Sequence, residues 1–518
     1  MLLLLALDGA TFDLLTPWMA AGYLPTLARL VAEGTAGELA STLPPVTAPA
    51  WASFMTGMHP AGHGLYDFFH HPAGQPQNIQ MVHSGHIRAP LFWDYLSAAG
   101  RTVGILNVPV THPPRPVNGY LIPGLLSPDQ GATCYPAGVW QPYASELGPY
   151  RLTPAALYRP GQEAAFIADL HALTRTQFAY ARRLLHDRPV DFFMLHILAT
   201  DIAQHKLWRH MDPAHPWHDP AQAARFGPAI RELFQQIDRA LADLLASLPP
   251  GSTTLVMSDH GFGPQQQTAN LNILFLASGL LRLKPGRGTT LRRAAARHPL
   301  TTRLGQRLWQ REKLLDFADV DWPNSRAYAL GHMGQVYLTP PGRANPQATL
   351  AAITTALHSL RQPGTGQPLA VTILPASAAG PGPYQSHGPD LHLILDGYRT
   401  VAYPMFAADG RILTAQRLGD SGHHRANGIF IAHGPGIRPG HKLAGARLVD
   451  LAPTILHLLG VPIPTGLDGH LLSGALLDPR PGPTQPPLPP PTDPATTLPA
   501  SEQAEIAARL QALGYMEG

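Results

Sequence analysis

The sequence predicts an α/β fold in which a mostly parallel central sheet is covered by helices on both faces. Short apolar runs that end in polar residues or glycine recur at residues 2–7, 102–106, 190–196, 253–258 and 428–432. Buried parallel strands have this continuous apolar character. Residues 164–185 and 223–248 repeat apolar side chains every three and four positions, which is typical of amphipathic helices. Strands that alternate with helices favour a parallel sheet.

The composition limits the class of protein. The chain has 518 residues, of which 45% are apolar, so it can bury a large core. Charged residues make up 14% and the formal net charge is +3, which argues against a nucleic-acid coat or a polybasic membrane binder. The single cysteine, Cys134, excludes an internal disulfide and a zinc site with several thiolates. Residues 1–7 lack the basic segment and length of a signal peptide, and no run reaches about 18 apolar residues. We therefore expect a soluble, cytoplasmic protein.

The domain organisation follows from breaks in this pattern. We expect one catalytic domain over residues 1–475, with an insertion or cap at about 270–385. The cap begins with a basic helical segment at 282–313, interpreted as a solvated amphipathic helix; binding to a polyanion or an acidic membrane surface is the alternative. Leu300, Leu304, Leu308 and Leu315 fall near one face of that helix. Residues 476–500 form a proline-rich linker, and 501–518 a short helix that ends near Gly514 and Tyr515.

Acidic residues follow three of the expected strands. Asp8 ends the first run, Asp201 follows the third, and Asp259 with His260 follows the fourth. In an open parallel sheet, ligands bind at the carboxyl ends of the strands, so these side chains are expected to gather at one edge. A buried carboxylate is costly unless a cation or hydrogen-bond donors meet it. A turn or helix-capping role is the alternative for Asp8.

Two further segments add a hydroxyl and more imidazoles. Thr47 lies between prolines in the segment PPVTAPAW, just ahead of a helical stretch, so its oxygen would face the positive end of a helix. A helix N-cap is the alternative role for Thr47. Asp201 and His205 are four residues apart and share one helix face, as ligands of one ion do. His423 and His424 are expected in a glycine-containing loop ahead of the last strand.

Taken together, these residues supply mixed nitrogen and oxygen ligands for two divalent ions. Carboxylate and imidazole shells suit Zn²⁺, with Mn²⁺ or Fe as alternatives. Two close metals can activate a nucleophile, hold the phosphate oxygens and stabilise the leaving oxygen in phosphoryl transfer.

The chain resembles the type I phosphodiesterase/nucleotide pyrophosphatase family of the alkaline-phosphatase superfamily. The matching segments are PPVTAPAWASFMTG, HGLYDFF, NVPVTHPP, SDHGFGP, SGHHR, HGPGIRPG, LVDLAPTILHLLGVPIPTGLDG and the terminal LQALGYMEG. The resemblance implies an alkaline-phosphatase-like core over residues 1–475 and a covalent intermediate on Thr47. It implies one metal held by Asp201, His205 and His424, and a second held by Asp8, Thr47, Asp259 and His260. His424 is preferred to His423 because the family reads Ser-Gly-x-His-Arg, with the ligand fourth.

One departure from the family pattern concerns the substrate. Nucleotide-cleaving members place an asparagine after the region of Gly57 and His63, where it donates to a phosphate oxygen; this chain has Asp67 or Phe68 there. Loss of such a donor costs a few kcal/mol of transition-state stabilisation. The candidates for a substitute donor, or for other substrate contacts, are His63, Asn107, His423 and Arg425.

The resemblance therefore implies a metal-dependent hydrolase of a small-molecule phosphate ester, foremost a phosphodiesterase, that requires no nucleic-acid partner. A phosphomonoesterase, a phosphonate hydrolase or a phosphotransferase on the same site is the alternative. Sulfatases of the superfamily carry a Cys/Ser-x-Pro-x-Arg motif, but Cys134-Tyr135-Pro136 lacks the arginine and lies far from the Thr47 segment. Phosphoglycerate-mutase-like members use serine as nucleophile and insert their extra domain directly after it. The threonine and the later insertion of this chain argue against that group. A protein that keeps the fold for binding, without turnover, would lack one of the metal-binding residues, and none of them is missing from the sequence.

Overall fold

The central sheet has the predicted mixed, mostly parallel character. The computed structural model describes residues 1–70, 78–128, 133–295, 299–309, 315–406, 410–415, 419–480, 482–490 and 498–513. Within these residues a nine-stranded sheet has the order β19-β2-β18-β8-β1-β7-β5-β6, with β20 paired to β2. Its strands are β1 (Leu2–Leu7), β2 (Thr35–Ala40), β5 (Val103–Val108), β6 (Gly119–Pro123), β7 (Phe192–Ile197), β8 (Thr253–Met257), β18 (Asn427–His433), β19 (His441–Lys442) and β20 (Ala446–Arg447).

The centre of this sheet is parallel and completely buried. β1 pairs in parallel with both β7 and β8, and Leu5 lies opposite Leu195 on one side and Val256 on the other. β18 runs antiparallel between β2 and β8. The five strands predicted from the apolar runs are confirmed. Because β1, β7 and β8 are adjacent and parallel, their carboxyl ends meet at one edge.

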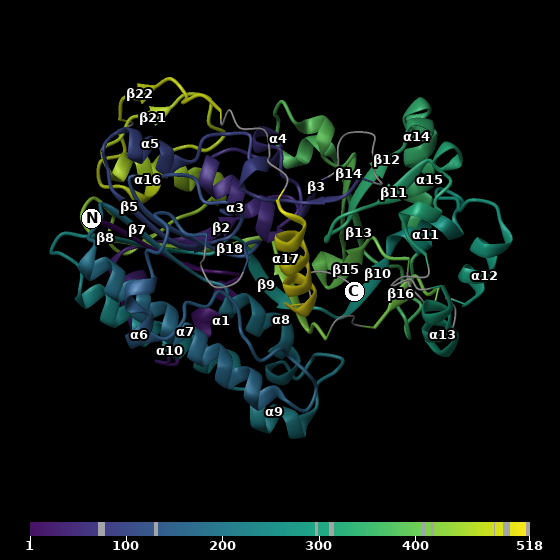
Figure 1. Cartoon of the computed structure of the whole chain (residues 1–518), viewed down its shortest axis with the longest axis horizontal. Helices are drawn as coiled ribbons and strands as arrows, with labels where there is room; N and C mark the ends of the chain where they lie inside the picture. Colours follow the sequence, from purple (N-terminus) through teal and green to yellow (C-terminus); the bar gives the residue numbers. More distant parts are fainter. Residues whose placement is uncertain are drawn as a thin grey trace.

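Helices cover both faces of the sheet (Figure 1). On one side lie α1 (Phe12–Ala20), α6 (Ala144–Leu147), α7 (Glu163–Asp187), α9 (Pro220–Phe226) and α10 (Ala229–Ala246). On the other lie α3 (Thr47–Thr56), α5 (Phe92–Ala98) and α16 (Leu451–Leu458). The helix predicted over 164–185 is confirmed as α7. The single helix predicted over 223–248 is wrong: it divides into α9 and α10 at Gly227 and Pro228. Proline has no amide hydrogen to continue a helix and is tolerated only near its start.

A second sheet stands beside the first, to the right in Figure 1, with its own apolar core. Its order is β11-β12-β14-β15-β10-β16, with β13 paired to β14. The strands are β10 (Gln267–Asn270), β11 (Ala327–Ala329), β12 (Gln335–Leu338), β13 (Val371–Pro375), β14 (Leu391–Leu395), β15 (Thr400–Tyr403) and β16 (Leu413–Thr414), with helices α11 (Leu271–Ala277), α14 (Pro340–Ala344) and α15 (Pro346–His358). The segment expected as an insertion, 270–385, lies within these limits, and its role as a cap stays a proposal.

The basic segment forms two helices instead of one. These are α12 (Arg287–Ala295) and α13 (Pro299–Trp309), and the proline at the start of α13 suits a first helical turn. Leu300, Leu304 and Leu308 are exposed, whereas Leu315 is buried. The end of the expected helix, with Arg311 and Lys313, lies outside the described residues.

The C-terminal segment returns to the main core. The helix predicted from residue 501 is α17 (Ala500–Leu513), and it buries Ile506 and Leu510 in the core of the main sheet. The predicted helix end at Gly514 and Tyr515 lies outside the described residues. The remaining elements are α2 (Pro25–Glu33), α4 (Pro60–His63), α8 (Ala199–Met211), β3 (Phe69–His70), β4 (Gln80–Met81), β9 (Gly261–Pro264), β17 (Gly422–Arg425), β21 (Ile463–Pro464) and β22 (Thr484–Gln485). Among the described helices, none has the length and apolar character needed to cross a membrane.

Candidate active site

Three neighbouring strands of the main sheet deliver buried carboxylates to one edge. Asp8 follows β1 directly, Asp259 follows β8 after one residue, and Asp201 lies in the first turn of α8 just after β7. All three side chains are buried. Gly9 has a φ of 68°, and its amide donates to Asp259 Oδ1 at 3.3 Å. A β-carbon at Gly9 would lie 2.7 Å from the Phe262 ring, so only glycine fits this turn. The sheet therefore gathers the predicted carboxylates.

The first group of candidate ligands is Asp201, His205 and His424. Asp201 and His205 project from one face of α8, as their spacing predicts. His424 comes from β17, which pairs with β9 as a two-stranded ribbon, so the expected loop around the two histidines is instead a short strand. His424 Nε2 lies 3.0 Å from His205 Nε2 and 3.3 Å from Asp201 Oδ1, and His205 Nε2 lies 3.5 Å from that oxygen.

Backbone carbonyls fix the tautomer that each of these two imidazoles has when it is neutral. His205 Nδ1 lies 3.0 Å from the carbonyl oxygen of Gly422, and His424 Nδ1 lies 2.9 Å from that of Pro45. A carbonyl oxygen only accepts, so each Nδ1 donates and each Nε2 of a neutral ring presents a lone pair. Burial first, and then the charges of His424 and Lys206, hold the pKa of His205 well below its usual value. Two lone pairs that face each other beside a carboxylate fit a shared metal cation.

The second group is Asp8, Asp259 and His260, with Thr47 beside them. His260 Nε2 lies 3.4 Å from Asp8 Oδ1, 3.3 Å from Asp259 Oδ2 and 3.4 Å from Thr47 Oγ1. His260 Nδ1 faces the carbonyl of Gly261 at 3.1 Å, so its Nε2 also presents a lone pair. Burial, with His424 next, lowers the pKa of His260 to about 3.

The charges of this second group are unbalanced without a cation. Asp8 Oδ1 and Asp259 Oδ2 are buried and accept no hydrogen bond from the described residues. Burial, and then the charges of Asp8 and Asp201, raise the pKa of Asp259 well above its usual value. Burial would also raise the pKa of Asp8, but the hydrogen bond and charge of His196, together with the charges of His260 and His424, leave that pKa lowered. The ligand atoms of Asp8, Asp259 and His260 lie within 4.8 Å of one another, as do those of Asp201, His260 and His424. This donor set fits two divalent metals.

Thr47 is the first residue of α3 and not its cap. The N-cap residue is Val46, and Thr47 is completely buried at the positive end of the helix. Its hydroxyl points to His260 and not back to the helix amides. The capping role considered for Thr47 is therefore wrong, and the helix places its oxygen beside the second group.

His196 was missed by the sequence analysis. It is the one polar side chain inside β7, whose other residues are apolar. Its Nε2 lies 2.8 Å from Asp8 Oδ2, and its Nδ1 lies 2.8 Å from the carbonyl oxygen of Asn107. The Trp51 indole also donates to Asp8 Oδ2, at 3.4 Å. These contacts hold one oxygen of Asp8 and leave Oδ1 facing His260. The sequence did contain a signal for His196, because it is a histidine within an apolar run that lies just before Asp201.

Three of the four residues predicted to contact substrate make local hydrogen bonds instead of lining the pocket described below. His63 Nε2 lies 2.9 Å from the Ser53 hydroxyl, and its Nδ1 accepts from the Leu65 amide. Asn107 accepts from the Tyr150 hydroxyl and donates to the carbonyl of His196.

Arg425 donates to backbone carbonyls of both strands of the β9–β17 ribbon and to that of Tyr398. Burial first, and then the charge of Arg399, lower its pKa to about 10. His423 differs from the other three, because it lines the pocket and its Nε2 lies 3.0 Å from the Tyr403 hydroxyl. The part played by these residues in substrate binding stays a prediction.

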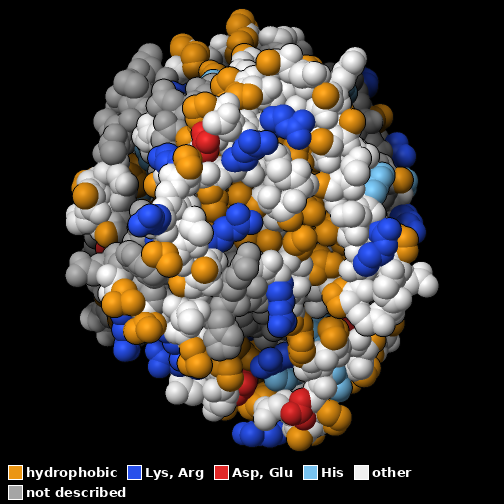
Figure 2. Space-filling view, turned by 90° about the vertical axis from the view of Figure 1, so that its right-hand side faces the viewer, with side chains coloured by type: hydrophobic (Ala, Val, Ile, Leu, Met, Phe, Trp, Pro, Cys, Tyr) orange, Lys and Arg blue, Asp and Glu red, His pale blue; other side chains and the backbone are white. Residues whose placement is uncertain are grey.

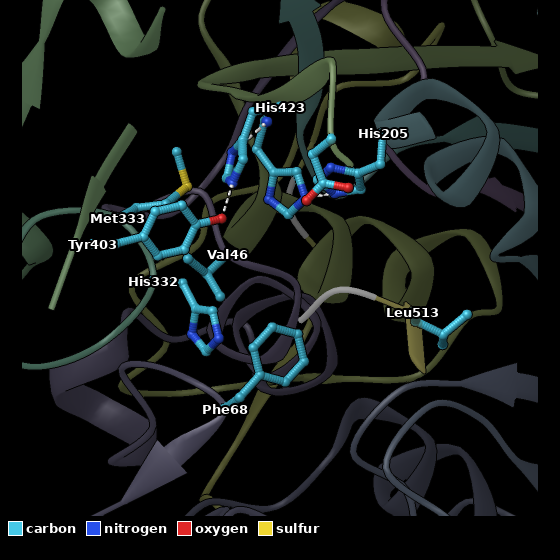
Figure 3. A pocket seen from close by; sticks show the side chains of 10 residues that line it. Val46, Phe68, His205, His332, Met333, Tyr403, His423 and Leu513 are labelled. Atoms are coloured by element: carbon cyan, nitrogen blue, oxygen red, sulfur yellow. Dashed lines mark hydrogen bonds between the residues drawn. The ribbon is translucent and has the colours of Figure 1, made fainter. Parts of the chain in front are cut away.

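A narrow pocket opens onto the first group (Figure 3). Its walls come from the segments just before α3 and β3, from α8, from the second sheet, from the β9–β17 ribbon with the segment just before β17, and from the C-terminal helix. They are formed by Val46, Phe68, His205, His332, Met333, Tyr403, Asp420, His423, His424 and Leu513. Of the two residues where the family asparagine is expected, Phe68 lines the pocket, whereas Asp67 is buried and does not line it. Asp67 accepts from the His332 ring at 2.5 Å and from the His332 amide at 2.9 Å. His332, from the segment of the second sheet, thus lines the pocket and is held there by Asp67.

A buried ion pair joins the two segments that carry the first group. Lys206 of α8 donates to Asp420, which precedes β17, and both side chains are almost completely enclosed. Burial raises the pKa of Asp420 to about 6 although Lys206 opposes the shift. The pair holds the helix of His205 against the ribbon of His424.

Comparison with known proteins was made on this geometry. A model of the family described as type I phosphodiesterase/nucleotide pyrophosphatase matches residues 2–404. No curated protein matches the chain. Murine ectonucleotide pyrophosphatase/phosphodiesterase 5 is similar in structure, with a TM-score of 0.51 and 12% identity over 90% of this chain and 96% of the other. An inactive threonine-to-alanine variant of that murine protein, in complex with AMP, has a TM-score of 0.50 and 13% identity over 90% of this chain and 96% of the other. Phosphonoacetate hydrolase from Sinorhizobium meliloti, in complex with phosphonoformate, has a TM-score of 0.47 and 14% identity over 89% of this chain and 95% of the other. At these identities the two murine structures show the fold alone.

Proposed function

Because the chain belongs to the type I phosphodiesterase/nucleotide pyrophosphatase family, we propose that it is a two-metal phosphodiesterase whose nucleophile is Thr47. The observation that carries the proposal is the position of Thr47 Oγ1. It lies at the buried start of α3 and 3.4 Å from His260 Nε2, next to two carboxylates that each keep one oxygen without a hydrogen bond from the described residues. The inactive threonine-to-alanine form of the murine relative also supports a threonine nucleophile.

The ligand sets follow the two groups. Asp201, His205 and His424 would hold one ion, and Asp8, Asp259, His260 and Thr47 the other. Zn²⁺ is the proposed metal because imidazole and carboxylate ligands suit it, with Mn²⁺ or Fe as alternatives. When bound, the two ions would lower the pKa of the threonine hydroxyl and neutralise the phosphate oxygens. His196 and Trp51 hold Asp8 in the orientation that its role as a ligand requires.

The reaction has two displacements at phosphorus. Thr47 Oγ1 forms a bond to phosphorus as the bond to the leaving oxygen breaks; the threonine gives up its proton and the leaving oxygen acquires one. A water oxygen then forms the second bond as the bond from phosphorus to Thr47 Oγ1 breaks, and the threonine hydroxyl is restored. The amino end of α3 faces the charge that develops during both steps.

The test compares hydrolysis of bis-p-nitrophenyl phosphate with that of p-nitrophenyl phosphate by protein loaded with Zn²⁺ or Mn²⁺. Thr47→Ala is the blank, and its metal content is measured in parallel. We expect faster cleavage of the diester, loss of turnover in Thr47→Ala, and a metal content close to that of the wild type. A faster monoester reaction would make the protein a phosphomonoesterase. A Thr47→Ala protein that keeps most of its activity would remove Thr47 as nucleophile.

A further inference from the structure

Large hydrophobic side chains are exposed on α12 and α13. Of the seven that are exposed among the described residues, four lie on these two helices: Leu291 at 59%, Leu300 at 71%, Leu304 at 59% and Leu308 at 68% exposed. Leu300, Leu304 and Leu308 are four residues apart and share one face of α13. An apolar helix face that packs on a core is buried, so this face serves something other than the fold.

Positive charge surrounds these leucines. Residues 282–309 contain no Asp or Glu. Arg287, Arg293, Arg303 and Arg307 are exposed on the same two helices, and none of them forms an ion pair with a described residue. Figure 2 views the molecule from this side, where Lys and Arg are scattered among hydrophobic side chains and acidic groups are few. The four leucines and four arginines are called the α12–α13 surface.

We propose that the α12–α13 surface docks on an anionic lipid bilayer. A helix with leucines on one face and arginines beside them lies in the plane of a membrane interface, with its apolar face among the lipid chains. The arginines match the negative charge of the headgroups, and each contributes about fivefold to the partition coefficient near such a surface. A nucleic acid would engage the arginines but would leave the leucines in water. The combination therefore fits a lipid surface.

The experiment is cosedimentation of the full chain with vesicles of phosphatidylcholine, with and without phosphatidylglycerol. We expect binding to the anionic vesicles that weakens as salt is added. Arg303→Gln with Arg307→Gln should lower the partition coefficient by about 30-fold, and Arg480→Gln, an exposed arginine elsewhere, should not. Leu304→Gln with Leu308→Gln should also weaken binding, whereas Leu477→Gln, 61% exposed outside this surface, should leave it unchanged.

Three results would overturn the proposal. One is equal binding, or no binding, to the two kinds of vesicle. Another is an unchanged partition coefficient in the Leu304 and Leu308 variant. The third is sedimentation of the free protein as a dimer that the same leucine changes dissociate, because a second copy would then cover the surface. Vesicle binding needs no turnover, so the test is independent of the proposed activity.

A separate observation concerns the C-terminal helix. Leu513, the last described residue of α17, lines the pocket that also contains His205 and His424 (Figure 3). The helix is anchored by Ile506 and Leu510, which are buried in the main core. Glu502 Oε2 lies 2.9 Å from His112 Nε2. A segment near the C-terminal end, well beyond the candidate ligands in the chain, thus forms one wall of the pocket.

The pocket is closed to a substrate when this wall is in place. Its volume is about 20 Å³, which is room for a water molecule, whereas ligand sites usually measure about 300–1,000 Å³. An ester can reach Thr47 only after part of the wall moves. Terminal segments open more readily than the centre of a sheet. We infer that α17 is the moving wall and that Leu513 limits which esters enter; this second inference rests on the proposed function.

The test places a thiol in the pocket and measures how fast it is alkylated. Met333→Cys, in a Cys134→Ala background, provides a single reactive group. Leu510→Asp puts a charge into the buried side of α17, and Ala508→Asp puts the same charge on its exposed side. We expect about tenfold faster alkylation with Leu510→Asp than with Ala508→Asp, because labelling follows the open fraction. Equal rates would overturn the inference, and a thermal melt checks that the core is intact.

The second arm compares Leu513→Ala with the wild type on a small and a bulky diester. We expect kcat/KM to rise for the bulky diester relative to the small one, because the trimmed wall admits a larger group. An unchanged ratio would remove Leu513 as a determinant of specificity. Absence of turnover in every protein would refute the proposed function, and the alkylation rates would still decide whether α17 moves.

Discussion

Replacing His424 and His423 in turn distinguishes a metal ligand from its neighbour. His424→Ala removes the Nε2 atom that lies 3.0 Å from His205 Nε2 and 3.3 Å from Asp201 Oδ1. His423→Ala removes a ring whose Nε2 lies 3.0 Å from the Tyr403 hydroxyl and whose Nδ1 accepts from the His424 amide. His424 therefore belongs to the first group of candidate ligands, and the ring of His423 accepts from the backbone amide of His424. The two substitutions remove the same side chain from adjacent positions of one strand.

The size of the difference follows from these positions. Removal of a group that only supports a ligand weakens metal binding by about 10–100-fold, so His423→Ala should fall at or below that range. His424→Ala removes one of three ligands and should weaken binding by more than about 100-fold. With the free ion at about 100 times the wild-type Kd, binding stabilises the fold by about 2.7 kcal/mol. A 100-fold weaker site would retain about 0.4 kcal/mol of that stabilisation.

The assay is metal content by mass spectrometry after gel filtration, together with urea unfolding with and without Zn²⁺. We expect His424→Ala to lose close to one ion per chain and most of the stabilisation by Zn²⁺, and His423→Ala to lose less of both. If His423→Ala lost more metal than His424→Ala, the assignment of the ligand would be reversed. Equal retention in both variants would show that neither imidazole binds the ion.

Other expectations concern stability, pH and substrate affinity. Lys206→Ala leaves the buried Asp420 without its ion pair and should lower the free energy of unfolding by about 3–5 kcal/mol, measured in urea. Burial, and then the charge of His59, hold the pKa of His63 at about 3, below its usual 6.5, so the unfolded chain binds more protons between these values. The stability from His63 is complete above pH 6.5 and falls by about 1.4 kcal/mol per pH unit below it; His63→Gln should remove this part in unfolding experiments at pH 6 and pH 5. Asp67→Asn removes the charged acceptor of the His332 ring and should raise KM about tenfold while metal content and kcat change little, as steady-state kinetics will show.

The sequence was sufficient to predict five strands of the main sheet, including its parallel centre, and the carboxylates that follow three of them. Leu2–Leu7 is an uninterrupted leucine-rich run, and only a strand buried on both faces uses such a run within so few residues. Asp8, Asp201 and Asp259 were found because the polar residue after such a strand is exceptional. The Asp201 and His205 pair followed from helical spacing alone. These predictions depend on local patterns, which a single sequence contains.

Contacts between distant segments were not predictable in the same way. Asp67 and His332 are separated by 265 positions, and nothing near either residue indicates the other. Asn107 was a candidate for a substrate contact, as a substitute for the asparagine donor of the family. The structure shows its side chain bonded to Tyr150 and to the carbonyl of His196. A polar side chain near a site can form hydrogen bonds with neighbouring protein groups or with a substrate. The sequence does not show which of these partners it has, whereas the structure does.

The way the site is built links metal binding to folding. Asp8 and Asp259 are buried together with one oxygen each that no described donor meets, and burial of such charges is costly unless a cation balances them. The segments that supply the ligands are far apart in the chain and reach the edge only when the sheet, α8 and the β9–β17 ribbon are in place. The Lys206–Asp420 pair fixes the spacing of α8 and that ribbon without an ion, whereas Asp8 and Asp259 have no Lys or Arg partner among the described residues. Loss of metal should therefore weaken the end of β1 and the start of α3, around Thr47, more than it weakens the contact between α8 and the ribbon. Hydrogen exchange of the Gly9 amide, compared with that of the Ser421 amide, would show this order.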